Sequence, residues 1–348
     1  MRYPKYLHDG GKIGFVAPSF GCAIEPYKTG FLKAQNNFKE MGYGIELGPN
    51  CYEQSGIGIS NTPAKCGQEL MDMYESSDND ILISCGGGEL MCEILEFVDF
   101  NKLSVLPAKW YLGYSDNTNF TFLQNILCDT AAIYGPCAAT FGMSKYHQSL
   151  KDTLDILTGK SHMVKGYEKW EAESLKTAEN PVPEYNLTET KKLVKYVEGK
   201  KVNDNEENIE FSGRLIGGCL DCLVNMTGTK YDKVKEFNEK YKKDGIIWFL
   251  ESCDLNVMSI RRAMWNLDNA GWFENLKGFI IGRPLVFGQE LMGLDQYDAV
   301  MGVIGKYNVP VIMDADIGHL PPSMPVVSGS YAKVNVKADD ITIEYKFK

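Results

Sequence analysis

Short apolar runs alternate with amphipathic stretches along the first part of the chain. A continuous apolar run of four to eight residues is typical of a buried strand, whereas apolar residues at a spacing of three or four indicate a helix. On this basis we predict strands at 12–17, 45–47, 80–84 and 109–112, and helices at 27–41, 64–74, 89–98 and 117–127. Because strands and helices alternate, we expect a parallel α/β sheet of flavodoxin or Rossmann type through about residue 150.

The pattern changes after this region. The stretch 161–208 contains Trp170, the acidic run Glu171-Ala172-Glu173 and two prolines, and it ends in a polar segment at 203–208, so we predict a connection with an exposed loop that covers a site. Further strands are predicted at 246–250, 278–282 and 309–313, with a hairpin at 332–347. The expected organisation is an N-terminal α/β domain at 1–160, the connection at 161–208, and a β-rich α/β domain at 209–348.

Composition narrows the classes of function. The net charge of -10 argues against a general nucleic-acid binder and against docking on anionic lipid, although a local basic pocket stays possible. No apolar run approaches membrane-spanning length, and the N-terminus lacks the apolar segment of a signal peptide. Ten scattered cysteines favour a reducing cytoplasm. Cys219 and Cys222 have C-x-x-C spacing but no second pair, so we predict no metal site and no cofactor.

One serine lies where a strand passes into a helix. Gly113-Tyr114-Ser115-Asp116 follows the predicted strand at 109–112 and precedes the helix at 117–127. A serine on such a turn is displayed as a nucleophile, next to helix N–H groups that can stabilise an oxyanion. The alternative is a helix N-cap without chemistry.

The turn Gly86-Gly87-Gly88 follows the preceding strand, so both turns are expected at the carboxyl edge of the sheet, where α/β proteins bind ligands. A phosphate cradle is one interpretation, although neither a G-x-G-x-x-G pattern nor a P-loop lysine is present. The other is an oxyanion site, in which the N–H groups of Gly87 and Asp116 are the two donors.

A serine nucleophile needs a base, and the chain has four histidines. His319 follows the strand at 309–313 in a loop rich in glycine, proline and acids, which is typical of a displayed catalytic side chain. Glu251 ends the apolar strand at 246–250 and could orient this imidazole. A structural histidine bonded to Asp316, and a glutamate that faces water, are the alternatives.

Several segments together resemble the LD-carboxypeptidase family of serine peptidases. They are Val16-Ala17-Pro18-Ser19, Gly113-Tyr114-Ser115-Asp116, Phe249-Leu250-Glu251 and Gly318-His319 with the proline-rich stretch to Gly329, and Gly86-Gly87 and Gly213–Gly218 complete the match. The resemblance implies a Ser115–His319–Glu251 triad, with Ser115 in the first domain and its partners in the second, and a site at the domain interface. It also implies a homodimer.

The family has two branches that differ in substrate. One removes the terminal D-alanine from murein tetrapeptides, and the other, microcin C immunity proteins, cleaves a peptide or amino acid from a modified nucleotide. The extra length and the loop with Trp170, which would stack on the base, resemble the immunity branch, as does the absence of an Arg-Gly-Gly-Tyr turn. Gly86 and Gly88 would also line the substrate. Cys219 and the run Ser252-Cys253-Asp254 depart from the immunity pattern.

The expected function is therefore amide hydrolysis of a peptidyl or aminoacyl nucleotide, with murein tetrapeptide cleavage as the alternative. A non-catalytic protein that binds a nucleotide or another small molecule is the rival from a different class. Thiol chemistry at Cys85, Cys137 or Cys253 is a third possibility.

Overall fold

The computed structural model describes residues 1–202 and 208–348, which form two compact units. The first unit comprises residues 1–162, 173–186 and 325–327, and the second comprises 163–172, 187–324 and 328–348. The chain therefore passes between the units several times, rather than once through a connecting segment as the sequence led us to expect.

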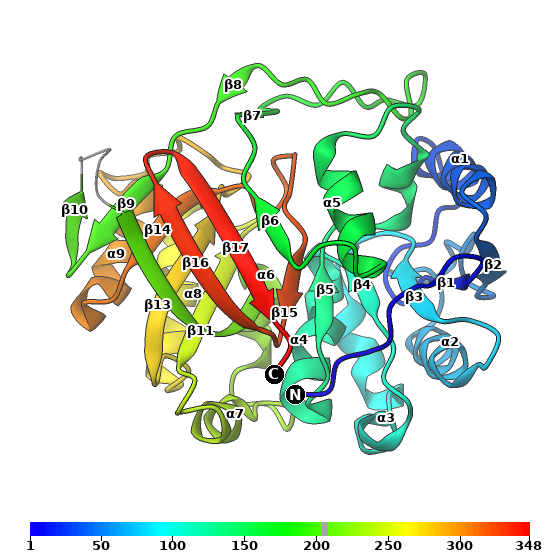
Figure 1. Ribbon diagram of the computed structural model, residues 1–348, viewed down its shortest axis with the longest axis horizontal. Coiled ribbons are helices and arrows are strands. Elements are labelled where there is room, and N and C mark those ends of the chain that lie inside the picture. The colour runs from blue at the N-terminus through cyan, green and yellow to red at the C-terminus, as the bar shows by residue number, and fades with distance from the viewer. Residues whose placement is uncertain (203–207) are drawn as a thin grey trace. The chain divides into compact units, whose positions relative to one another are not determined.

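The first unit is built on a six-stranded sheet (Figure 1). Its order is β15 (Val326–Ser328), β5 (Ala132–Tyr134), β4 (Tyr111–Gly113), β3 (Ile81–Ser84), β1 (Lys12–Val16) and β2 (Gly44–Leu47). The pairs β1–β2, β1–β3, β3–β4 and β4–β5 are all parallel. The order 2-1-3-4-5 is that of flavodoxin, so the predicted fold class of this part is confirmed.

Helices pack on this sheet through their apolar faces. Phe31 and Phe38 of α1, for example, contact Phe15 of β1 with ring centroids 5.2 and 5.9 Å apart. The elements are α1 (Tyr27–Glu40), α2 (Pro63–Glu75), η1 (Met91–Phe97), α3 (Phe100–Val105), η2 (Ser115–Asn117), α4 (Thr118–Cys128), η3 (Ala138–Gly142) and α5 (Gln148–Leu157). The helix predicted at 89–98 is a 3₁₀ helix that begins at Met91. The N–H groups of Glu89 and Leu90 are held by the Gly58 carbonyl, which delays its start.

The second unit contains a nine-stranded mixed sheet, in which four parallel strands lie between antiparallel ones. The order is β10 (Lys200–Val202), β9 (Val194–Val197), β14 (Val311–Ala315), β13 (Leu276–Gly282), β12 (Ile246–Glu251), β11 (Asn208–Cys219), β16 (Tyr331–Lys337), β17 (Asp340–Lys346) and β6 (Met163–Lys165). Strands β11 to β14 are the parallel ones. The predicted strands and the terminal hairpin are confirmed.

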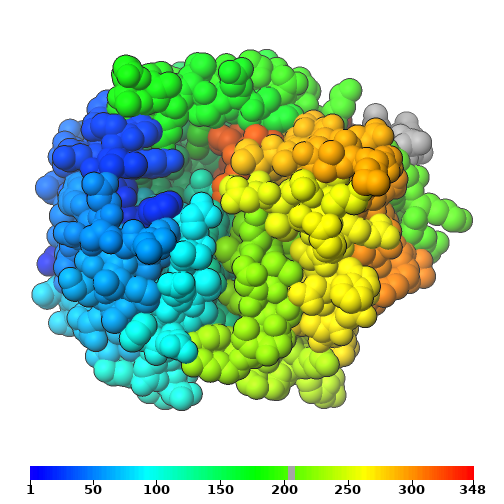
Figure 2. Space-filling view, turned by 180° about the vertical axis from the view of Figure 1, so that it is seen from behind, coloured from blue at the N-terminus to red at the C-terminus, as the bar shows by residue number. Residues whose placement is uncertain are grey.

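Helices of the second unit are α6 (Leu220–Met226), α7 (Val234–Lys240), α8 (Val257–Asn269) and α9 (Gln296–Ile304), with the 3₁₀ turn η4 (Gly305–Tyr307). Helices α8 and α9 pack against each other on the face seen in yellow and orange in Figure 2. Asn256 caps α8 by accepting a hydrogen bond from the Ser259 N–H, and Asp295 caps α9 in the same way through Asp298.

The stretch 161–208, predicted as a connection with an exposed loop, also contains strands. It contributes β6, β9 and β10 to the large sheet and forms a separate pair, β7 (Lys169–Trp170) with β8 (Glu189–Thr190). The polar segment predicted at 203–208 lies, except for its last residue, outside the described residues. In the part of the chain that the structure describes, no helix is long and apolar enough to cross a membrane.

Candidate active site

Ser115 occupies a left-handed backbone conformation directly after β4, with φ of 62°. For a residue other than glycine this conformation is costly and is kept only where the surroundings enforce it. Here the Ser115 N–H donates a hydrogen bond to the Tyr134 hydroxyl over 3.1 Å, while η2 and α4 begin immediately behind it. The strand–turn–helix geometry predicted for a displayed serine is present.

The glycine turn lies against this serine. A Cβ placed on Gly87 would stand 3.1 Å from both Cβ and Oγ of Ser115, so the glycine leaves room for the hydroxyl group. The Gly86 carbonyl accepts a hydrogen bond of 2.9 Å from the side chain of Asn117 in η2. The Phe20 N–H donates to the Gly87 carbonyl over 2.9 Å. These bonds connect the turn 86–88, the turn that carries Ser115 and the loop after β1.

The carboxylate of Asp116 joins the same three segments. It is 3% exposed and accepts hydrogen bonds from Ser19 Oγ at 2.5 Å, from the Met91 N–H at 2.9 Å and from Asn119 Nδ2 at 2.9 Å. Burial raises the pKa of Asp116 to about 6, although the Ser19 hydrogen bond acts in the opposite direction. The sequence pointed to the backbone of Asp116 and missed this side chain.

These residues lie at the topological switch point of the sheet, between the carboxyl ends of β1 and β3, with β4 beside them. This is where open α/β sheets bind ligands. Glu69 of α2 holds the loops there, because its two carboxylate oxygens accept the N–H groups of Ala17 and Asn50 at 2.9 and 2.8 Å. Burial raises the pKa of Glu69 to about 7.

In the second unit, His319 and Glu251 form a pair. Nδ1 of His319 lies 2.8 Å from Oε2 of Glu251, which is 2% exposed at the end of β12. Gly318 has a φ of 111°, and a Cβ there would lie 2.6 Å from the same carboxylate oxygen, so only glycine lets the loop approach this closely. Glu251 is therefore a buried partner of the imidazole rather than a residue that faces water.

The environment of His319 favours its charged form. Burial lowers the pKa of the imidazole, but the Glu251 carboxylate and a hydrogen bond with Cys253 raise it, and the net pKa lies well above the ordinary value. Asp221 holds the segment that follows Glu251, because its carboxylate accepts the N–H groups of Cys253 and Asp254 at 3.1 and 2.7 Å.

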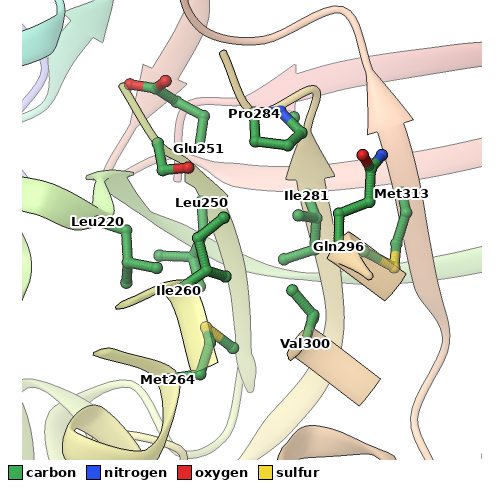
Figure 3. A pocket seen from close by; sticks show the side chains of 12 residues that line it. Leu220, Leu250, Glu251, Ile260, Met264, Ile281, Pro284, Gln296, Val300 and Met313 are labelled. Atoms are coloured by element: carbon green, nitrogen blue, oxygen red, sulfur yellow. The ribbon is translucent and has the colours of Figure 1, made fainter. Parts of the chain in front are cut away.

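An apolar cavity of about 20 Å³, room for one water molecule, lies beneath Glu251. Figure 3 shows Leu250, Ile260, Ile281 and Val300 around it, while the carboxylate of Glu251 points away from them. The cavity is lined mostly by apolar side chains, with Ser252 and Gln296 as its other polar residues, while the Glu251 carboxylate pairs with His319.

Trp170 differs from our expectation of an exposed loop aromatic. Its side chain is 5% exposed and packs edge-on against Phe287, with ring centroids 5.0 Å apart. The guanidinium of Arg283 lies over the indole at 4.9 Å. The large apolar surface of this ring is therefore buried within the second unit, to which residues 163–172 belong.

The structure thus groups the predicted residues in two sets. Ser115, Asp116 and the turn 86–88 lie together in the first unit, and Glu251 pairs with His319 in the second. Among the described residues, no group of three or more His, Cys, Asp or Glu side chains is arranged to hold a metal ion.

The ten cysteines are all in the reduced form. Burial raises the pKa of Cys137 to about 12 and that of Cys85 well above its usual range, so both thiols are neutral and weakly nucleophilic. Burial also raises the pKa of Cys253.

Two segments of the chain match models of a known protein family. Residues 13–135 match the LD-carboxypeptidase N-terminal domain, and residues 212–334 match the LD-carboxypeptidase C-terminal domain. A putative carboxypeptidase of Vibrio cholerae is 25% identical, over 93% of this chain and 92% of its own. A probable murein peptide carboxypeptidase of Bacillus subtilis is 23% identical, over 98% and 94%.

Solved structures share the fold. An MccF-like protein from Bacillus anthracis superposes with a TM-score of 0.82 at 20% identity, over 99% of this chain and 100% of the other. The microcin C7 self-immunity protein MccF, in complex with aspartyl sulfamoyl adenosine, gives 0.79 at 21% identity, over 99% of both chains. A muramoyltetrapeptide carboxypeptidase from Oxalobacter formigenes gives 0.70 at 19% identity, over 97% and 99%. With both of its domains matched in order, the chain belongs to the LD-carboxypeptidase family of serine peptidases.

Proposed function

We propose that Ser115 is the nucleophile of this peptidase, that His319 is its general base and that Glu251 orients the imidazole. The observation that carries this assignment is the 2.8 Å contact between His319 Nδ1 and the buried Glu251 carboxylate. A carboxylate in this position fixes the tautomer and stabilises the imidazolium that forms when the base takes a proton. The strained, displayed conformation of Ser115 supports its part in the scheme.

In this mechanism, Oγ of Ser115 bonds to the amide carbonyl carbon while its proton passes to Nε2 of His319. The N–H groups of Gly87 and Asp116 stabilise the oxyanion. The C–N bond then breaks, and the imidazolium returns the proton to the leaving amine. Water, deprotonated by the same imidazole, hydrolyses the acyl-enzyme and restores the serine. The scheme requires Ser115 of one unit and His319 of the other to reach the same substrate.

For the substrate, we favour an aminoacyl or peptidyl nucleotide. The support is the similarity to MccF proteins across the whole chain, one of which binds aspartyl sulfamoyl adenosine. A murein tetrapeptide is the second candidate, and two observations favour it. The Bacillus subtilis relative is described as a murein peptide carboxypeptidase, and Trp170, the expected base-stacking residue, is buried against Arg283 and Phe287.

The test compares the purified protein with Ser115→Ala on two substrates, an L,D-linked murein tetrapeptide and an aminoacyl sulfamoyl adenosine, with products identified by mass spectrometry. We expect serine-dependent cleavage of the nucleotide conjugate and a loss of at least about 10³-fold in Ser115→Ala. Ser104→Ala, in α3, is the matched control and should behave as the wild type. Serine-dependent release of D-alanine alone would assign the murein substrate instead.

A second measurement tests the alternative that the protein binds a nucleotide without cleaving it. A protein that only binds nucleotides would bind the conjugate tightly, release no product, and leave Ser115 unlabelled by a fluorophosphonate. Under the proposed scheme, labelling or turnover at Ser115 depends on His319, so His319→Ala should abolish it. Turnover that survives in Ser115→Ala would contradict the assignment of the nucleophile.

A further inference from the structure

A buried ionic cluster that the proposed mechanism does not use lies beside the loop that carries His319. Arg283 follows β13 and is 1% exposed, and Asp316 follows β14 and is 0% exposed. One guanidinium nitrogen of Arg283 bonds Oδ1 of Asp316 at 2.5 Å, and the other bonds the Asp314 carbonyl at 2.8 Å. Lys191 is a second cation near the same carboxylate, with Nζ 3.6 Å from Oδ2.

Asp316 also closes the loop on itself. Its carbonyl accepts the Met324 N–H at 2.7 Å, so that residues 316 and 324 are joined at the base of the loop. Its Oδ2 accepts the Tyr167 N–H at 2.7 Å. Within the loop, the Gly318 N–H donates to Ser323 Oγ at 3.2 Å. His319 is therefore held in a loop whose two ends meet at the backbone of Asp316, and the buried carboxylate of the same residue is bound by Arg283 and the Tyr167 N–H.

The end of β13 connects this cluster to the catalytic pair. A Cβ on Gly282, the residue before Arg283, would lie 2.1 Å from the Ile317 carbonyl and 3.0 Å from Cβ of Glu251. The backbone of the histidine loop thus packs directly on the strand end that also borders Glu251. A small displacement of the loop relative to β13 would change the distance between His319 and Glu251.

We propose that Arg283 and Asp316 are positioning residues, which hold the loop 316–324 on the end of β13 so that His319 faces Glu251. Trp170 is part of the same group of positioning residues, because its ring covers one face of the Arg283 guanidinium. The inference rests on the proposed role of His319 as the base. A buried ion pair is a weak source of stability compared with apolar packing, but removing one partner strands the other charge and displaces what it holds.

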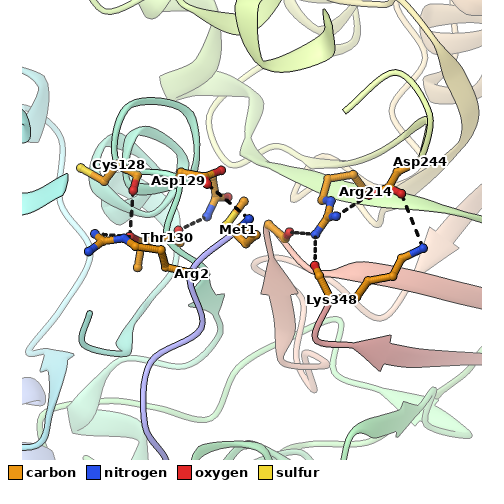
Figure 4. Close-up of polar contacts among 10 residues, drawn as sticks. Met1, Arg2, Cys128, Asp129, Thr130, Arg214, Asp244 and Lys348 are labelled. Carbon is orange, nitrogen blue, oxygen red and sulfur yellow. Dashed lines mark hydrogen bonds and ion pairs between the residues drawn. The ribbon is translucent and has the colours of Figure 1, made fainter. Parts of the chain in front are cut away.

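The chain offers a matched control in Arg214 of β11. It is 3% exposed, forms an ion pair with Asp244, bonds the Gly329 carbonyl at 3.1 Å and lies 4.2 Å from the Tyr241 ring. Figure 4 shows Arg214 between Asp244 and the C-terminal Lys348. It therefore has the same kinds of partner as Arg283 but holds the hairpin end rather than the histidine loop.

The experiment compares Arg283→Lys, Asp316→Asn and Arg214→Lys in the full chain, because all three substitutions nearly preserve side-chain volume. The first readout needs no substrate and follows the titration of His319 by NMR, assigned with His319→Gln. The second is kcat and KM on whichever substrate the wild type cleaves. Thermal unfolding reports the loss of stability in each variant.

We expect Arg283→Lys and Asp316→Asn to move the His319 pKa toward its ordinary value and to lower kcat at least tenfold, with KM within about twofold. Arg214→Lys should reduce stability to a similar degree and leave both readouts unchanged. A wild-type titration of His319 in Arg283→Lys and Asp316→Asn would overturn the inference, as would an equal effect of Arg214→Lys. If the wild type cleaves no substrate, the proposed function fails, while the titration still decides the positioning role.

Discussion

At the scale of single residues, the pair of His319 and Glu251 makes a prediction about pH. The pKa of His319 is raised well above its ordinary value, in spite of burial, by Glu251 and Cys253. Because a base must be neutral to accept a proton, kcat/KM should fall about tenfold per pH unit below that raised pKa. Glu251→Gln removes the charge, so the acid limb should move to lower pH while the maximal rate falls by a factor on the order of 10² or more.

The pair of His319 and Glu251 also makes the stability of the fold depend on pH. A histidine whose pKa is raised on folding contributes stability that is fully present below about pH 6.5, its unfolded pKa, and is lost as the pH rises through the folded value. The difference in urea midpoint between the wild type and Glu251→Gln should therefore be largest below pH 6.5 and shrink at alkaline pH. A difference that grows with pH would contradict the raised pKa.

Some of the site residues could be predicted from the sequence, and others could not. Ser115, Glu251 and His319 each follow a predicted apolar strand, which made them candidates, and the resemblance to the LD-carboxypeptidase family then combined them into a proposed triad. Trp170 was misjudged because its neighbours in sequence are polar, whereas Arg283 and Phe287, which cover its ring, lie more than a hundred residues away. The Asp116 carboxylate was missed because its partners, Ser19 and Met91, come from other loops.

At the scale of elements, the glycine turn after β3 allows a matched comparison. Alanine at Gly87 would place Cβ 3.1 Å from Ser115 Cβ and Oγ, while alanine at Gly86 would place it 3.3 Å from the Phe20 carbonyl. Both changes crowd the turn to a similar degree and should cost about 1 kcal/mol of unfolding free energy. Only Gly87→Ala displaces the serine, so it should lower kcat about tenfold or more. Equal activity of the two variants in the hydrolysis assay would show that the turn does not set the Ser115 rotamer.

Strands and helices with strong local patterns were predictable, and those that depend on distant partners were not. The apolar runs of β1, β3, β12 and β13 are buried on both faces, so composition alone identified them. The strands β9 and β10 escaped prediction because they are short and rich in lysine. They exist because β9 pairs with β14, in a register that joins Val194 to Met313. The residues of β9 and β10 themselves do not indicate that β14 is the strand with which β9 pairs.

At the scale of the whole molecule, the two compact units do not correspond to two continuous stretches of sequence. Segment 173–186 belongs to the first unit, where Lys176 lies 4.3 Å from the Tyr27 ring and His147 lies 5.4 Å from that of Tyr185. Strand β15 joins the first sheet from near the C-terminus. Its three residues follow a proline-rich loop, and nothing in their pattern tells which sheet they complete.

This organisation predicts the behaviour of fragments. Residues 1–160 alone lack β15, so the backbone of β5, whose three residues are fully buried, becomes an unpaired sheet edge. We expect this fragment to have a lower urea midpoint than the intact chain and to aggregate at micromolar concentration. A synthetic peptide of residues 323–329 should raise its midpoint and suppress aggregation by adding the missing strand, whereas a scrambled peptide should not. If the fragment is as stable as the full chain and indifferent to the peptide, β15 does not complete the first sheet in solution. If the peptide rescues it, the stability of the serine-bearing unit depends on a strand that directly follows the His319 loop in sequence.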